Sequence, residues 1–420
     1  MEQRRLNMSN ETDYRAVVNP IYLTAKTAVC LMADAEIPGA DEIVRKLGVN
    51  HSDLGMADPD MMLGNELVVE AKYRTMCRLI EESGIKTNAD LPCGYTPKAL
   101  HMTEKGLRFV GLDLPIVAQE VEPVILSLAA HPDQIQIHGI DATNLDSLIT
   151  ALSDVDGPVC ISTEGMMMYF TESEASAVVS NISHLLAKHG GCWITPDPEF
   201  MVQFFLTFQS VLGEKAIRKL EDSRKTATGQ SDVLNLTNSF IIRPTDIKGT
   251  LETSYKFLQK HNLKAERINL AENMPELNAY RKLTPDQITA FKTAMANCFY
   301  WKITLDENQK LQTEKQETKP FELSYTLKDK MFSASLSGRM DTITAPELLK
   351  AWEKEKAENE ITAVEIDCSG LQYISSAGLR VLLMIYKSLE DKSRFRMSNV
   401  SDDVLEILEV TGFDQFLLRV

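Results

Sequence analysis

The sequence predicts two α/β domains in one chain, and three observations support this. Short apolar runs alternate with helical segments, a pattern typical of strands separated by helices in a mostly parallel sheet. The length of 420 residues exceeds one ordinary domain of about 100–200 residues. A polar segment at residues 306–319 separates two apolar blocks. We therefore expect a larger α/β domain, a linker and a smaller α/β domain.

The composition excludes several classes of protein. Apolar residues make up 44% of the chain and charged residues 25%, which is typical of a globular domain rather than a disordered or fibrous one. A formal net charge of -16 would repel a phosphate backbone, so we expect no nucleic-acid partner. The chain shows neither an apolar run of about 18 residues nor a signal-peptide core, which favours a cytoplasmic protein with no membrane contact.

The cysteines and histidines indicate neither disulfides nor a metal site. The seven cysteines include no CxxC pair, and most lie inside apolar runs. We expect reduced, buried thiols rather than disulfides. The seven histidines show no metal-ligand spacing, so we expect no metal.

The domain boundary is expected in the segment DENQKLQTEKQETK. Its fourteen residues, Asp306 to Lys319, contain one Leu and no other apolar side chain, and Pro320 follows. Such a segment cannot bury enough surface to offset its ordering entropy, so it is either a solvated linker or a charged surface helix. The predicted parts are residues 1–305, a linker at 306–320 and residues 321–420.

The first block alternates helical and strand patterns. Ala71 to Ser83 has helical spacing and ends at Gly84, and Glu172 to Lys188 is an amphipathic helix. Four apolar runs are predicted to be strands: Phe109 to Leu112, Ile135 to Ile137, Val159 to Ile161 and Cys192 to Ile194. Ligands of such sheets bind beyond the carboxyl ends of the strands.

Polar residues follow four predicted strand ends. Gly94 lies in the turn of DLPCGYTP, where glycine permits close backbone approach to a ligand. Asp113 follows nineteen residues later in the sequence. In dinucleotide sites, an acid at this spacing after a glycine turn accepts hydrogen bonds from ribose hydroxyls. Asp141 and Glu164 end the next two strands. A single Asp after a strand is also typical of a helix cap or a turn, but four such ends in order indicate a shared ligand site.

The order and spacing of these strand ends resemble the class I S-adenosylmethionine-dependent methyltransferases. Asp113-Leu114-Pro115, together with the segment TEGMMMYF that contains Glu164 and Tyr169, resembles the leucine carboxyl methyltransferase and polyketide O-methyltransferase branch. The resemblance covers roughly Tyr22 to Ile303 and implies a Rossmann-like domain. It implies that Gly94 faces the methionine part of S-adenosylmethionine and that Asp113 binds its ribose.

The resemblance also implies further site residues. Asp141 would contact the adenine amino group, and Glu164 would lie near the sulfonium. Arg74 is the candidate partner of the cofactor carboxylate, with Lys72 second, because bidentate recognition favours arginine. Tyr169 is either an acceptor-side catalytic residue or a core aromatic. The resemblance has one departure, because Pro92 replaces a glycine of the first motif and has no N–H to donate.

The second block has the pattern of a compact α/β unit. Phe332, Ala334 and Leu336 alternate with polar positions as in a half-buried strand. The segments that follow are expected to be a helix at Ala345 to Ala357, a strand at Thr362 to Asp367, a loop at Cys368 to Ser375, a helix, a strand at Phe395 to Met397 and a helix at Asp402 to Leu408.

This block resembles a STAS domain, the fold of bacterial anti-sigma factor antagonists. The resemblance rests on LSGRMD, IDCSGL, YISSAGL and LEVTGF, which occur in the family's order. In those antagonists a serine at the start of a helix is phosphorylated, and the added charge blocks partner binding. That serine falls at Ala377 here, so Ser376 and Ser375 are the phosphorylation candidates, although either is also a plausible helix cap.

Two functions remain open from the sequence. The first is a methyltransferase that uses S-adenosylmethionine to modify a carboxylate or hydroxyl of a small molecule or protein, regulated or localised by the STAS domain. The second is a signalling protein whose STAS domain binds an anti-sigma factor or serine kinase, with a first domain that senses S-adenosylmethionine or is inactive. Pro92 favours the second, and the intact acids Asp113, Asp141 and Glu164 favour the first.

Overall fold

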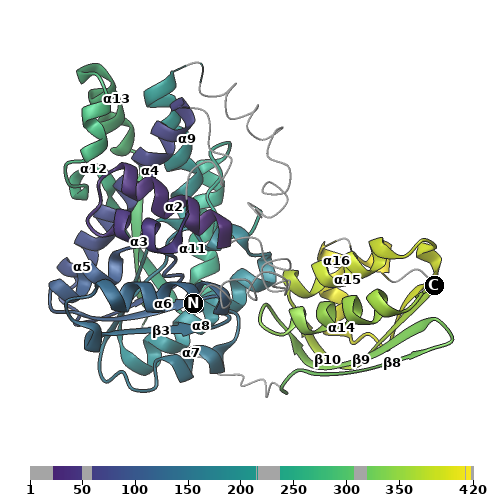
Figure 1. Cartoon of the computed structure of the whole chain (residues 1–420). Helices are drawn as coiled ribbons and strands as arrows, with labels where there is room; N and C mark the ends of the chain where they lie inside the picture. The colour runs from purple at the N-terminus through teal and green to yellow at the C-terminus, as the bar shows by residue number, and fades with distance from the viewer. Residues whose placement is uncertain are drawn as a thin grey trace. The chain divides into compact units, whose positions relative to one another are not determined.

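The computed structural model describes residues 22–49, 59–213, 215, 237–306, 319–411 and 413–417. These residues fall into two compact units, residues 22–306 and residues 319–417, each of which is described by itself (Figure 1). Residues 307–318, which form most of the expected linker, lie outside the described residues, as do residues 1–21 and Gly412.

The first unit is built on a seven-stranded sheet. Its strands are β1 (Thr87–Asp90), β2 (Arg108–Asp113), β3 (Ile135–Gly139), β4 (Val159–Ser162), β5 (Gly191–Thr195), β6 (Leu263–Asn269) and β7 (Phe299–Leu305). They lie in the order β3-β2-β1-β4-β5-β7-β6, and β7 alone of these seven strands runs opposite to the other six. The expected Rossmann-like class with a mostly parallel sheet is confirmed.

The helices of this unit either precede β1 in the chain or lie between strands. They are α2 (Tyr22–Asp34), α3 (Ala40–Leu47), α4 (Pro59–Glu82), α5 (Lys98–Glu104), α6 (Pro115–Leu128), α7 (Leu145–Ala151), α8 (Glu172–His189), α9 (Phe200–Leu212), α11 (Ile247–Lys260), α12 (Leu270–Asn273) and α13 (Pro285–Met295). Short 3-10 turns include η3 (Met167–Tyr169). Helices α4 and α8 both pack against β4 and β5 in the middle of the sheet.

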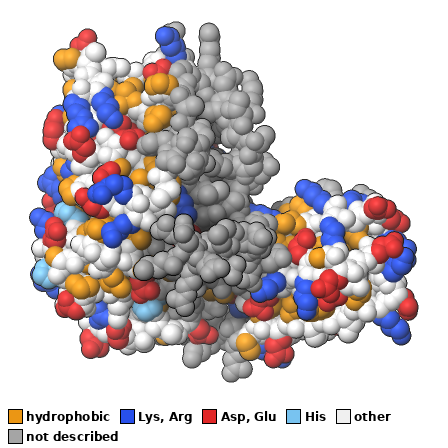
Figure 2. Space-filling view, in the orientation of Figure 1, with side chains coloured by type: hydrophobic (Ala, Val, Ile, Leu, Met, Phe, Trp, Pro, Cys, Tyr) orange, Lys and Arg blue, Asp and Glu red, His pale blue; other side chains and the backbone are white. Residues whose placement is uncertain are grey.

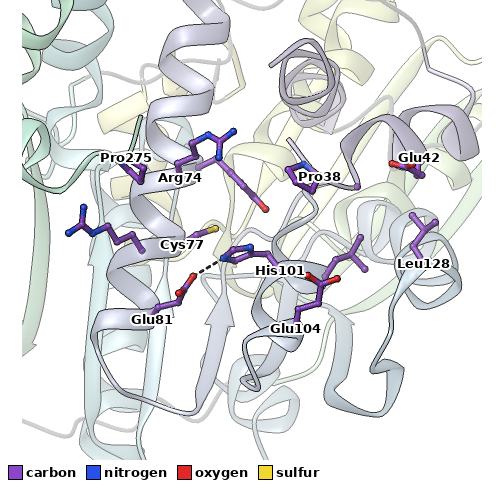
Figure 3. A pocket seen from close by; sticks show the side chains of 13 residues that line it. Pro38, Glu42, Arg74, Cys77, Glu81, His101, Glu104, Leu128 and Pro275 are labelled. Atoms are coloured by element: carbon purple, nitrogen blue, oxygen red, sulfur yellow. Dashed lines mark hydrogen bonds and ion pairs between the residues drawn. The ribbon is translucent and has the colours of Figure 1, made fainter. Parts of the chain in front are cut away.

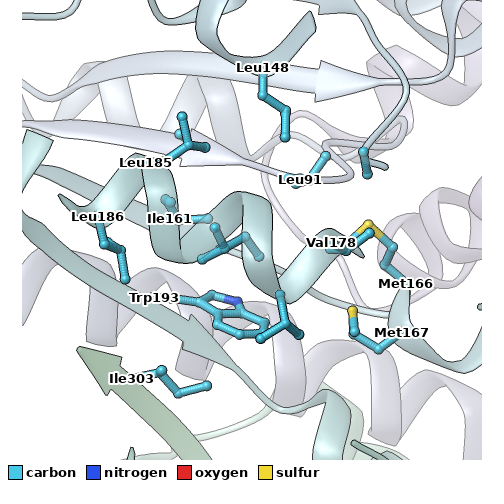
Figure 4. Close-up of a cluster of buried hydrophobic side chains, with 14 of the residues drawn as sticks. Leu91, Leu148, Ile161, Met166, Met167, Val178, Leu185, Leu186, Trp193 and Ile303 are labelled. Atoms are coloured by element: carbon cyan, nitrogen blue, oxygen red, sulfur yellow. The ribbon is translucent and has the colours of Figure 1, made fainter. Parts of the chain in front are cut away.

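A continuous apolar core holds the sheet to its helices. Figure 4 shows Trp193 of β5 among Ile161, Leu186 and Ile303, all of them buried. The indole of Trp193 also stacks on Phe240, with ring centroids 5.2 Å apart. Burial of large side chains of this kind stabilises the fold by about 1.5–3 kcal/mol each. The core fixes the strand ends that carry the polar residues described below.

One glycine sets the approach of a helix to the sheet. A Cβ atom on Gly139, the last residue of β3, would lie 2.8 Å from the Cα atom of Pro115. Pro115 is the first residue of α6, where its fixed φ and missing N–H suit a helix start. Only glycine at position 139 therefore lets α6 begin beside the ends of β2 and β3.

The second unit is a four-stranded sheet with helices. Its elements are β8 (Glu322–Lys328), β9 (Met331–Met340), α14 (Ala345–Glu358), β10 (Ala363–Ile374), α15 (Ser376–Ser388), β11 (Phe395–Ser398), α16 (Asp402–Thr411) and α17 (Asp414–Leu417). The strand order is β11-β10-β9-β8, with β8 antiparallel to β9 and the other pairs parallel. The expected α/β class is confirmed for this unit too.

The expected loop at Cys368 to Ser375 is wrong except for its last residue. Strand β10 runs on to Ile374 and stays paired with β9 through two register shifts. Because of these irregularities the buried side chains, Cys368, Leu371 and Ile374, recur every third residue rather than every second. The period of two that identifies a half-buried strand is therefore missing from the sequence.

The remaining features concern the thiols, the metal ligands and the surface. All seven cysteines are free and buried, which confirms that expectation. Within the described ranges, no cluster of His, Cys, Asp and Glu could hold a metal ion, and no helix has both the length and the apolar character to cross a membrane. Figure 2 shows charges of both signs interspersed on the visible face of each unit.

Candidate functional site

Three acidic residues lie at one edge of the first sheet. Asp113 is the last residue of β2, Asp141 follows the end of β3, and Glu164 follows the end of β4. The strands are parallel neighbours, with Asp113 paired to Gly139 and the end of β1 paired to the end of β4. Their carboxyl ends therefore bring the three carboxylates to the same edge.

The turn after β1 is tied to Asp113. Gly94 has a φ of 55°, a conformation that favours glycine. Its N–H donates to Oδ2 of Asp113 at 2.7 Å, and the N–H of Leu114 donates to Oδ1, also at 2.7 Å. Pro92, in a cis peptide bond, lies two residues before Gly94. The predicted pair Gly94 and Asp113 is thus in direct contact.

Asp113 is poised to titrate near neutral pH. Its side chain is buried, and this burial raises the pKa of the carboxyl group to about 7, while the two backbone N–H donors oppose the shift. A buried carboxylate of this kind is costly to ionise unless donors surround it. Further donors, such as ribose hydroxyls, would therefore favour the ionised form.

Asp141 occupies a tight turn. Its Oδ1 accepts hydrogen bonds from the N–H of Thr143 at 2.8 Å and from the hydroxyl of Thr143 at 2.6 Å. The cap of α7 is Asn144, whose side chain accepts from Ser147. The turn role that the sequence left open for Asp141 is therefore present, and its carboxylate is nevertheless at the same edge as Asp113.

Glu164 lies between two lysines. Its Oε1 is 3.7 Å from Nζ of Lys72, and its Oε2 is 3.8 Å from Nζ of Lys98. Both distances are longer than a hydrogen bond, so the lysines attract the carboxylate without occupying its lone pairs. Among the described residues, and apart from its chain neighbours, nothing lies within 4 Å of a Cβ atom placed on the adjacent Gly165. The described part of the chain therefore leaves space at Gly165, next to Glu164 in the sequence.

Lys98 forms a buried ion pair that sequence reasoning missed. Its Nζ is 2.8 Å from Oδ1 of Asp90, and the exposed fractions of the two side chains are 2% and 0%. Ser162 donates a second hydrogen bond to the same oxygen. Burial alone would lower the pKa of Lys98, but Asp90 and Glu164 outweigh it and raise that pKa. Lys98 is therefore held in its charged form.

The carboxylate of Asp90 is only partly satisfied by hydrogen bonds. Burial raises the pKa of Asp90, and Lys98 opposes that shift. Among the described residues, Oδ2 of Asp90 has no hydrogen-bond partner. The sequence signal for this pair was available, since Asp90 ends β1 and Lys98 begins α5, but neither lies at a position that the resemblance assigns.

The two candidates on α4 point in different directions. Lys72 reaches Glu164 and also lies 5.0 Å from the ring centroid of Phe200. The Nε of Arg74 instead donates to the buried Glu70 at 2.6 Å, and Arg74 lines a cavity to which neither Asp113 nor Glu164 contributes. Lys72, the second choice from sequence, is the one beside Glu164.

Asp197 is another residue that sequence reasoning left without a role. It follows β5 and is fully buried. Its carboxylate accepts from the N–H groups of Gly165, Met166 and Met167 at 2.6–3.0 Å. Asp197 thereby fixes the turn that carries Glu164.

Tyr169 lies at the end of that turn. Its hydroxyl donates to Thr24 of α2 at 3.1 Å. Burial raises the pKa of Tyr169 above its usual value, so the phenol is a hydrogen-bond donor and not a base at neutral pH. Met167 and Met168, from the same segment, are buried and act as packing residues.

The second unit places the two candidate serines differently. Ser375 is the N-cap of α15: its hydroxyl accepts from the N–H of Gly378, and the residue is 1% exposed. Ser376 is half-buried, and Ala377 is 3% exposed. Gly378 allows close packing, because a Cβ atom there would lie 2.7 Å from a side-chain carbon of Ile374. Ser376 is the more accessible of the two serines.

Comparison with known families identifies the second unit. The family model described as "Mlab, STAS domain" matches residues 325–419. An anti-sigma factor antagonist from Mycobacterium paratuberculosis is 26% identical and similar over 23% of this chain and 81% of its own, with a TM-score of 0.21. The expected STAS domain is confirmed.

Solved structures similar to the first unit include methyltransferases. Magnesium protoporphyrin IX methyltransferase from Synechocystis, with bound SAH, is 10% identical and similar over 63% of this chain and 93% of its own, with a TM-score of 0.36. A DUF574 family protein from Streptomyces avermitilis is 10% identical over 66% and 96%, with a TM-score of 0.40. No curated protein matches the chain in sequence.

Proposed function

We propose that this chain, which ends in a STAS domain, is an S-adenosylmethionine-dependent O-methyltransferase that the STAS domain regulates or localises. The observation that carries the proposal is the single sheet edge that holds Asp113, Asp141 and Glu164, with Lys72 and Lys98 on either side of Glu164. The acceptor would be a carboxylate or hydroxyl of a small molecule or a protein.

The donor set suits the cofactor. Asp113 would accept hydrogen bonds from the ribose hydroxyls, and Asp141 from the adenine amino group. At the methionine end, Glu164 would attract the ammonium and sulfonium charges, and Lys72 the carboxylate. Two further observations support the proposal that a polar ligand binds at this edge. The described residues leave space at Gly165, and they offer no hydrogen-bond partner to Oδ2 of Asp90.

The residues of this chain would act mainly by positioning. S-adenosylmethionine would supply the methyl group, which would pass from its sulfonium sulfur to an acceptor oxygen in an in-line displacement. Orientation supplies most of the acceleration of such a step. A carboxylate acceptor is already ionised at neutral pH and needs no base. Tyr169, as a protonated phenol, would hold the acceptor oxygen only by turning its one O–H away from Thr24 and toward the acceptor.

The affinity for S-adenosylmethionine is expected to rise with pH through about 7. Ribose hydroxyls donate to the ionised Asp113, so below its pKa of about 7 binding must first release a proton. The affinity then falls by up to about tenfold for each pH unit below the pKa and is level above it. Titration calorimetry between about pH 5.5 and 8.5 measures this dependence.

The matched control is Asp113→Asn, which keeps the shape of the side chain but cannot ionise. We expect its affinity to be weak and independent of pH over the same range. A pH dependence that is the same in both proteins would assign the titration to another group and contradict the role of Asp113.

Pro92 supports a second candidate, a signalling protein whose first unit only senses S-adenosylmethionine or is inactive. Proline at position 92 offers no N–H to a ligand at the turn after β1. In this alternative, the STAS domain binds an anti-sigma factor or serine kinase and carries the function. Cofactor binding without methyl transfer would favour the sensor.

For the regulatory role, we propose Ser376 as the phosphorylated residue. It is half-buried at the first position of α15, where the helix dipole would stabilise a phosphate. The hydroxyl of Ser375 instead caps the helix by accepting a hydrogen bond. After co-expression with a partner serine kinase, mass spectrometry should find phosphate that is lost in Ser376→Ala and kept in Ser375→Ala. Phosphate that survives in this region when both serines are changed to alanine would refute the assignment.

A further inference from the structure

A cavity of about 580 Å³ lies between helices α3, α4 and α5, apart from the acidic sheet edge. This volume falls within the range of about 300–1,000 Å³ that is common for small-molecule sites. Figure 3 shows it with Arg74 on one side and with Glu42 and Glu104 on the other. Its lining therefore carries charges of both signs, with Glu81 on the same helix as Arg74 and with Glu42 and Glu104 across from them.

The basic side comes from α4. Arg74 and Arg78 are four residues apart and so lie on the same face of the helix. Among the described residues, Glu70 alone bonds to Arg74, through Nε, which leaves the terminal guanidinium nitrogens available to a ligand. Arg78 bonds to Glu82 through Nε and to the carbonyl of Asn273 through one terminal nitrogen. Paired guanidinium groups of this kind suit a carboxylate.

The acidic side comes from α3 and α5. Glu42 and Glu104 are both exposed side chains that line the cavity. The Oε1 of Glu42 lies 3.5 Å from Nη2 of Arg45, whereas no described residue forms an ion pair with Glu104. Glu81 and His101, in contact at 2.7 Å, join α4 to α5 along the same lining. An ammonium group would find an acceptor on this side.

The remaining lining is largely apolar. Tyr73 and Cys77 are buried, and Pro38, Gly39, Leu100, Leu128 and Pro275 line the rest of this part. Burial raises the pKa of the Cys77 thiol to about 12, so it remains protonated and serves as an apolar surface rather than a nucleophile. The cavity therefore offers one anion site, one cation site and apolar walls.

We propose that this cavity binds a zwitterion of the α-amino acid class that has a large apolar side chain. The carboxylate would lie against Arg74 and Arg78, the ammonium against Glu104 and Glu42, and the side chain against the apolar walls. An anion alone would leave the glutamates unmatched, and a cation alone would leave the arginines unmatched. This site is separate from the proposed cofactor site and does not depend on it.

The test is titration calorimetry of the full chain with L-phenylalanine in the absence of any cofactor. L-Phenylalanine is expected to bind. Two analogues test the charged ends: phenylpropanoate lacks the amine, and phenethylamine lacks the carboxylate. We expect each to bind at least about tenfold more weakly than L-phenylalanine, because each loses a charged hydrogen-bonding partner.

Variants tie the binding to the cavity. Arg78→Gln and Glu104→Gln change exposed side chains, and each is expected to weaken L-phenylalanine about tenfold. Glu122→Gln, an exposed glutamate on α6, is the matched control and should bind as the native chain does. Thermal melts of the three variants check that the fold is kept. No binding of L-phenylalanine, binding of either analogue as tight as that of L-phenylalanine, or unchanged binding in both cavity variants would overturn the proposal.

Discussion

Replacing Lys98 with methionine is expected to lower the free energy of unfolding by about 3–5 kcal/mol, the usual cost of removing one partner of a buried ion pair. Asp90 is fully buried, and its ammonium partner lies at 2.8 Å. Lys98→Met would leave this carboxylate with Ser162 as a donor to one oxygen, while the other oxygen has no partner among the described residues. Urea denaturation followed by circular dichroism measures the change.

Two controls separate the buried pair from a general effect of charge. Lys98→Met combined with Asp90→Asn removes both charges, and we expect it to recover much of the lost stability. Lys256→Met removes a lysine that pairs with Glu252, where both side chains are 66% exposed. Such surface pairs contribute little, so its effect should stay below about 1 kcal/mol. If Lys98→Met costs no more than Lys256→Met, the account of the pair is wrong.

Asp113→Ala is expected to weaken S-adenosylmethionine about a hundredfold or more. Two ribose hydroxyls would lose a charged acceptor, and each such hydrogen bond contributes about 1.5–3 kcal/mol. The change also removes the acceptor of the Gly94 and Leu114 N–H groups, so the turn after β1 would lose its anchor. Calorimetric titration of the purified variant gives the affinity directly.

Glu122→Ala serves as the control for this variant, because it removes an exposed carboxylate from α6, the helix that begins next to Asp113. We expect its affinity for S-adenosylmethionine to equal that of the native chain. A thermal melt of Asp113→Ala distinguishes loss of the site from loss of the fold. Native affinity in a folded Asp113→Ala protein would exclude the ribose role.

The sequence predicted the strands that are made of apolar residues and missed features that depend on polar burial. Strands β2 to β5 each contain one of the expected apolar runs. The interior strand β1 has the sequence TNAD, all of it buried, and only its end could be inferred. Asn88 and Asp90 can be buried there because they bond to Ser162 across to β4. That compensation is not visible until the strands are paired.

The reversed direction of β7 was likewise beyond the sequence. It is set by how the segment after α13 returns to the sheet between β5 and β6. The hydrophobic pattern of a strand is the same whichever way the strand runs in the sheet. This pattern therefore carries no information about strand direction.

The candidate site was predictable where it depends on strand ends and not where it depends on helix faces. Asp113, Asp141 and Glu164 follow consecutive strands, and parallel pairing is enough to bring them to one edge. Lys72 and Arg74 are two residues apart on α4 and point roughly 160° away from each other, so only one can face Glu164. Which one does so is decided by the packing of α4, which the sequence does not reveal.

The most direct test of the central claim is titration calorimetry of the full, unmodified chain with S-adenosylmethionine and with S-adenosylhomocysteine. We expect both to bind with micromolar affinity at neutral pH, and such binding would justify a screen for the methyl acceptor. Failure of both to bind would contradict the claim that the acidic edge is a cofactor site, and it would leave the STAS domain as the functional part of the protein.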